Sequence, residues 1–93
     1  MKSDTAKYYI DWLAMDQLGG QLVTLKRYED ARLLLEHNAA EFPQKDLVLL
    51  NLANLYALMG RNQEARAYYN KTLSVNAKNE EAKNRLKELD RKD

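Results

Sequence analysis

The chain contains no cysteine, so its 93 residues can form neither a disulfide nor a metal site built on thiolates. It also lacks an excess of charge of one sign, because 15 basic residues stand against 14 acidic residues and the net charge is +1. A nearly neutral chain has no strong field to attract nucleic acid or an anionic membrane. We therefore expect neither of them as a partner.

Long apolar runs are absent as well. The first residues, MKSDTAKYYIDWLAMD, include no uninterrupted apolar segment of about 7 to 15 residues, which is the length that a signal peptide needs. No stretch approaches the roughly 20 apolar residues that a membrane helix needs. We expect no signal peptide in the chain as given and no membrane span. The cellular location is otherwise open, with the cytoplasm slightly favoured.

Glycine and proline are scarce, with three glycines and one proline, whereas helix-forming residues are abundant. Apolar residues recur every three or four positions, and no alternating pattern typical of a strand is present. The sequence therefore predicts an all-α chain of five helices. Their expected ranges are about 5–25 after a cap at Ser3 or Asp4, 28–41 ahead of Pro43, 46–59 between a cap at Asp46 and a left-handed Gly60, 63–75, and a last helix capped by Asn79.

The sequence repeats itself at an offset of 34 residues. Leu18 then aligns with Leu52, and further identical pairs include Arg27 with Arg61, Ala31 with Ala65, and Arg32 with Arg66. A fixed period of this length indicates stacked helix pairs. The chain then forms one domain, 1–93, with a helical extension over 1–11, repeats over 12–45 and 46–79, and a capping helix over 80–93.

These residues resemble the tetratricopeptide repeat, in which a large apolar residue, Leu, a small residue and an aromatic residue follow at set spacings. In the second unit the pattern falls on Leu49, Leu52, Ala53, Tyr56, Gly60, Ala65 and Tyr69. The first unit departs at Lys26, where a turn glycine is typical. The resemblance implies a right-handed α-α superhelix of two helix pairs plus a C-terminal capping helix.

Two adjacent glycines, Gly19 and Gly20, lie inside the first predicted helix, where each costs roughly 1 kcal/mol relative to Ala. Gly19 aligns with Ala53, and we expect it to let the two helices of the pair approach closely at Ala31. Gly20 aligns with Asn54, which the resemblance places on a concave wall formed by the first helix of each pair. It either makes the helix locally flexible or leaves a notch for a side chain or the backbone of a partner.

The resemblance also implies a concave wall, formed by the first helix of each pair, that usually holds an extended peptide or a helix of another protein. Asparagine amides on such a wall can donate to and accept from a peptide backbone. Polar residues also simply keep an exposed wall soluble, and the pattern leaves both readings open. The predicted groove residues are Asp16, Gly20, Leu47, Leu50, Asn51, Asn54, Asn84 and Arg85.

Some family members grip a C-terminal carboxylate through five groove positions rich in Lys, Asn and Arg. Only Asn51 and Arg85 agree with that pattern here, whereas Asp16, Gly20 and Glu81 depart from it. Two of the departures reverse the charge, so we expect acidic tails to be repelled.

Nothing in the sequence is typical of a catalytic, metal or cofactor site. The only histidine, His37, falls on the polar side of its predicted helix. We therefore expect a non-catalytic module, without metal or cofactor, that binds a peptide or protein segment in the groove.

A second function remains open at the start of the chain. The cluster Tyr8, Tyr9, Ile10, Trp12 and Leu13 either covers the first unit or forms a patch that binds another copy or an attached domain. The alternative is thus self-association, for example as a homodimer, or docking within a longer protein. The repeat pattern also resembles the C-terminal part of some larger bacterial proteins, which is the setting that such docking would have.

Overall fold

Five α-helices and no strand make up the part of the chain that the structure describes, as the sequence predicts. The computed structural model describes the backbone of residues 2–92 and the side chains of residues 13–91. The helices are α1 (Lys2–Thr24), α2 (Tyr28–Glu41), α3 (Asp46–Leu58), α4 (Asn62–Val75) and α5 (Glu80–Lys92). The bounds of α2 are those predicted, because Pro43 disfavours helical geometry at the residue before it.

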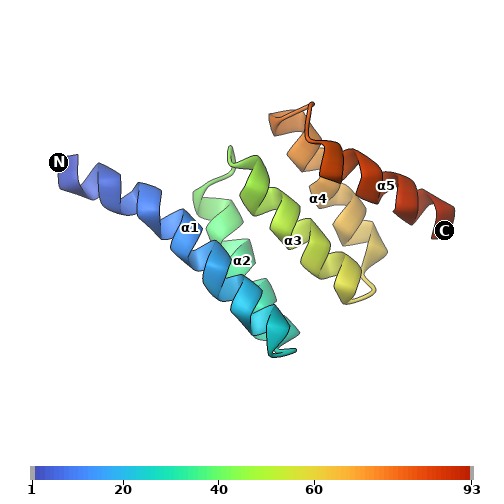
Figure 1. The fold of residues 1–93 in the computed structure, drawn as a ribbon, viewed down its shortest axis with the longest axis horizontal. Coiled ribbons are helices and arrows are strands. Elements are labelled where there is room, and N and C mark those ends of the chain that lie inside the picture. The colour runs from blue at the N-terminus through green and yellow to red at the C-terminus, as the bar shows by residue number, and fades with distance from the viewer. Residues whose placement is uncertain (1, 93) are drawn as a thin grey trace.

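Successive helices pack side by side, and α1, α3 and α5 run in one direction while α2 and α4 run in the other (Figure 1). α1 also contacts α3. The chain measures 48 × 31 × 16 Å, and its radius of gyration is 13.4 Å. A compact globule of this length has a radius of gyration of about 12 Å. The helices therefore form an open stack rather than a closed bundle.

The N-terminal part of α1 projects beyond the end of α2 (Figure 1). Because α1 begins at Lys2, Ser3 and Asp4 lie inside the helix, and the prediction that one of them caps it is wrong. The cluster predicted to cover the first unit includes Tyr8, Tyr9, Ile10 and Trp12. The side chains of these four residues lie outside the described part of the structure.

Both helix pairs turn through the same motif. Gly60 follows α3 with a φ of +76°, as predicted, and Lys26 occupies the equivalent position after α1 with a φ of +63°. The amide of the next residue donates to a carbonyl five residues back, at 2.8 Å in the first pair and 2.9 Å in the second. This is the Schellman pattern, which satisfies carbonyls that a helix end leaves without partners.

Asn79 and Asp46 both lie at the start of a helix, but only Asn79 caps one. Asn79 caps α5 as predicted, since its Oδ1 accepts the amide of Ala82 at 3.0 Å. Asp46 is the first residue of α3 rather than its cap, and the cap position belongs to Lys45. The Asp46 carboxylate instead accepts the side-chain amides of Asn76 at 2.9 Å and Asn79 at 3.1 Å. Asp46 therefore ties the start of the second repeat to the turn before α5.

Residues of α2, α3, α4 and α5 form the hydrophobic core, and α3 supplies the most of them. Gly19 of α1 packs closely against this core. A Cβ at Gly19 would lie 2.5 Å from Cδ2 and 2.8 Å from Cγ of Leu35, closer than real carbon atoms approach. The packing role predicted for Gly19 is confirmed, although the neighbour is Leu35 rather than Ala31, because a Leu side chain reaches across the helix contact where an Ala does not.

Candidate functional site

A face shared by α1, α3 and α5 carries most of the polar residues that the sequence singles out. Its central stripe lies on α3, where residues 47, 51, 54 and 58 follow one another at helical spacing and so share one side. Leu47 is 50% exposed and Leu58 is 61% exposed, so both ends of the stripe are apolar and open. We call this face the inner wall. Its members are Asp16, Gly20, Leu47, Asn51, Asn54, Leu58, Glu81, Arg85 and Glu88.

Asp16 and Asn51 join α1 to α3 on the inner wall. The Nδ2 of Asn51 donates a hydrogen bond to Oδ2 of Asp16, and the other carboxylate oxygen, Oδ1, is buried without a hydrogen-bond partner among the described residues. Burial raises the pKa of Asp16 to about 6, and the hydrogen bond from Asn51 opposes this rise. A carboxylate is thus held at a site where the charged form is disfavoured.

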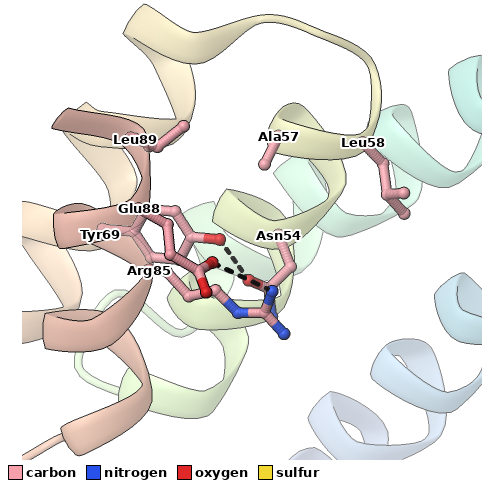
Figure 2. Close-up of a pocket in the computed structure, with 7 residues that line it drawn as sticks. All are labelled: Asn54, Ala57, Leu58, Tyr69, Arg85, Glu88 and Leu89. Carbon is pink, nitrogen blue, oxygen red and sulfur yellow. Dashed lines mark hydrogen bonds and ion pairs between the residues drawn. The ribbon is translucent and has the colours of Figure 1, made fainter. Parts of the chain in front are cut away.

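Asn54 connects α3 to both α4 and α5. The hydroxyl of Tyr69 donates to Oδ1 of Asn54, and Nδ2 of Asn54 donates to Oε2 of Glu81 at 3.3 Å (Figure 2 shows the Tyr69 contact). Tyr69 is only 1% exposed, and burial raises its pKa to about 12, so the hydroxyl stays protonated and acts as the donor. These two contacts determine which way the amide of Asn54 points.

A pocket of about 360 Å³ opens between α3 and α5 beside Asn54. Figure 2 shows Arg85 and Glu88 of α5 facing Asn54 across this pocket, with Leu58 at its far side. The guanidinium of Arg85 lies 3.6 Å from Glu81 and 3.8 Å from Glu88, so one cation is shared by two carboxylates. The pocket therefore combines apolar lining residues with one carboxylate, Glu88, whose cationic partner is shared with Glu81 outside the pocket lining.

The predicted groove residues have different exposures. Gly20 and Asn84 are exposed, and an added Cβ at Gly20 would meet nothing within 4 Å. Leu50 is 5% exposed, so its side chain belongs to the core and offers almost no surface to a ligand. Leu50 is adjacent to Asn51 in the chain, but neighbouring side chains on a helix point about 100° apart. Asn51 therefore lies on the inner wall while Leu50 lies in the core.

Nothing in the sequence pattern indicates that Tyr69 is part of this site. The repeat pattern assigns it to the core, and its ring is indeed buried there. Its hydroxyl nevertheless reaches Asn54 on the inner wall. Tyrosine commonly has this double role, because its body is apolar while its hydroxyl needs a partner when buried.

A second hollow, of about 440 Å³, lies between α2 and α4 on the other side of the stack. Its lining is mainly small and apolar, with one carboxylate, Glu36, and one ammonium group, Lys71. The ammonium lies 4.6 Å from the centre of the Tyr68 ring and so already has a partner in the chain. The charges of this hollow balance each other, so the hollow provides less basis than the inner wall for recognising a partner.

Among residues 13–91, no three His, Asp or Glu side chains are grouped so that they could hold a metal ion. Within the same described part of the chain, no helix combines the length and the apolar character that a membrane span needs.

Comparison with known families gives one match. A family model described as tetratricopeptide repeat matches residues 22–89, from the end of α1 to the last turns of α5. A search of curated proteins finds no match. The matched region contains the repeated turn motif and all the inner-wall residues of α3 and α5.

Proposed function

The chain belongs to the tetratricopeptide repeat family, and we propose that it holds a peptide or protein segment against the inner wall formed by α1, α3 and α5. Repeats of this family generally mediate protein-protein interactions and are typically non-catalytic. We propose the same for this chain, whose single histidine, His37, is exposed on α2.

The observation that carries the proposal is the unused hydrogen-bonding capacity of two amides on α3. An asparagine side chain has two N–H donors and two acceptor lone pairs. Asn51 uses one N–H on Asp16, while Asn54 uses one N–H on Glu81 and one lone pair on the Tyr69 hydroxyl. Each amide is thus held in place by the protein and keeps both a donor and an acceptor for a peptide backbone, so little ordering is needed on binding.

Apolar surface adds to this polar centre. Leu47 and Leu58 flank the two asparagines along α3, and both are at least half exposed. Burial of apolar area supplies affinity, whereas the fixed amides orient the backbone of the guest.

A selection from random peptides tests this proposal. Peptides displayed on phage are selected against the wild-type chain, and each binder is compared on the Asn51→Ala/Asn54→Ala double variant. We expect binding to weaken by about 10-fold, as two lost hydrogen bonds imply. Asn70→Ala, at an exposed asparagine on α4, is the matched control.

All variants are compared at a temperature where circular dichroism shows them fully folded, because Asn54→Ala also removes the partner of a buried hydroxyl. The proposal is wrong if every selected peptide binds the wild type and the double variant equally well.

One observation favours self-association as a second candidate. Leu18 of α1 is 47% exposed, whereas its repeat equivalent Leu52 is 0% exposed on α3, a helix that packs against both α2 and α4. The outer side of α1 therefore shows apolar surface that a further helix could cover. Sedimentation from micromolar to millimolar concentration tests this candidate, and a monomer throughout that range excludes it.

A further inference from the structure

The inner wall is acidic although the chain as a whole is not. Its ionisable residues are three carboxylates, Asp16, Glu81 and Glu88, against the single guanidinium of Arg85, a formal net charge of −2 when Asp16 is ionised. The whole chain has a net charge of +1. Negative charge is therefore gathered on the face that we propose as the binding surface.

Arg85 does not cancel this charge. It lies between Glu81 and Glu88, at 3.6 and 3.8 Å, and its side chain is half exposed. The distances are those of loose, solvated pairs, so each carboxylate keeps room for a second cation. Asp16 sits across α3 from them and has no cation paired with it among the described residues.

The apolar ends of the wall limit how the guest can lie. Leu47 and Leu58 are separated by 11 positions on α3, which is about 16 Å along a helix axis. An extended chain covers that length with about five residues. A guest that runs along α3 therefore places its middle residues opposite Asn51 and Asn54, where the carboxylates converge.

We propose that the segment bound on the inner wall is basic, with Lys or Arg at its centre and apolar residues on either side. This inference rests on the proposed function and adds the chemistry of the partner to it. The cation lies between the carboxylates of α1 and α5, and the apolar residues cover Leu47 and Leu58. An acidic segment would add to the repulsion already present on this face and is rejected.

The experiment reads the composition of the peptides from the selection described above. Those that depend on Asn51 and Asn54 are sequenced, and we expect Lys and Arg to outnumber Asp and Glu in them relative to the unselected library. The affinity of a selected peptide is then measured by fluorescence anisotropy for the Glu81→Gln/Glu88→Gln variant. Glutamine keeps an acceptor for Asn54 but removes the charge, so we expect binding to weaken by about 5- to 10-fold.

The matched control is Glu41→Gln/Glu80→Gln, which removes two charges from exposed positions outside the inner wall. We expect it to leave affinity within about 2-fold. Salt should weaken the wild-type complex between about 50 mM and about 500 mM and should affect the Glu81→Gln/Glu88→Gln variant less.

The outcomes separate the two proposals. Groove-dependent peptides that are neutral or acidic, or that bind the Glu81→Gln/Glu88→Gln variant as tightly as the wild type, overturn the basic-partner inference and leave the binding function in place. Failure to recover any groove-dependent peptide overturns the function itself, and the inference with it.

Discussion

Replacing Asp16 with asparagine should stabilise the protein at neutral pH and not at acidic pH. The side chain is partly buried on α1, and one of its oxygens, Oδ1, is buried without a partner among the described residues. Burial is the larger of the two effects on its pKa, which rises from 3.8 to about 6. Asparagine has nearly the same shape, keeps an acceptor for Asn51 and has no charge to bury.

The direction of this pH dependence follows from how many protons Asp16 binds in the folded and in the unfolded chain. Between pH 3.8 and about 6 the folded chain binds more protons at Asp16 than the unfolded chain does, so stability falls as pH rises through this range. The favourable contribution of Asp16 protonation to the stability of the fold is fully present below pH 3.8 and is lost once the pH exceeds about 6. The full change in pKa corresponds to about 3 kcal/mol. Because the side chain is also partly exposed, solvent screening reduces the expected value to about 1 kcal/mol.

Urea denaturation of wild type and Asp16→Asn, followed by circular dichroism from pH 4 to pH 8, measures this effect. We expect the stability difference to increase from pH 4 to pH 7 by about 1 kcal/mol in favour of the variant and to stay level above that. Other acidic groups, such as Asp46 whose pKa is lowered by the hydrogen bond from Asn76, are present in both proteins and cancel. A constant difference across the whole range would refute the reasoning, and Glu41→Gln, at an exposed position, reports the general effect of removing one exposed carboxylate.

Four further substitutions test the local packing and the turns, each by urea denaturation. Gly20→Ala should stabilise the fold by about 0.5 to 1 kcal/mol, since the new Cβ enters open space. Gly19→Ala should destabilise the fold by about 1 to 3 kcal/mol, because its Cβ would clash with Leu35. Equal effects of the two substitutions would show that the two glycines do not differ in packing. Lys26→Gly should stabilise by about 0.5 to 1 kcal/mol by relieving a positive φ, and a loss of stability would contradict strain at this turn. Asn79→Ala should cost about 1 kcal/mol through the lost cap of α5, and no change would show that the cap is not stabilising.

The helices and turns were predictable because their causes are local. The repeat at 34 residues places Lys26 on Gly60, and the structure shows the same turn at both positions. Asn79 precedes a helix start, and its side chain caps that helix. In each case the hydrogen-bonded residues that determine the geometry lie within five positions of each other in the chain.

Contacts between distant residues were not predictable in this way. Asp46 has the sequence signature of a cap, yet its carboxylate binds two amides about 30 residues further along the chain, as the separations of 30 and 33 show. The Tyr69 hydroxyl likewise reaches Asn54, 15 residues away. Which of several polar partners a side chain selects depends on how the helices are stacked, and periodicity does not contain that information.

The boundary between wall and core was predicted least well. Leu50 and Asn51 are neighbours on α3, and both were expected in the groove, but Leu50 is buried. A polar pattern indicates which side of a helix faces water, whereas the exact edge depends on how far the next helix extends over it. Here Asp16 of α1 contacts Asn51 and Glu81 of α5 contacts Asn54, one on each side of the exposed stripe of α3.

The same edge explains why we expect Asp16 to affect both stability and the proposed binding. At the repeat offset of 34, Asp16 takes the position of Leu50, so a carboxylate stands where the second repeat has a buried leucine. Burial at this position raises the pKa of Asp16, and the charge adds to the acidic inner wall. Asp16→Asn should therefore raise stability at pH 7 and at the same time weaken the binding of a basic peptide. If the variant gained stability with no loss of affinity at pH 7, Asp16 would be a structural residue only, and the acidic contribution to binding would rest on Glu81 and Glu88 alone.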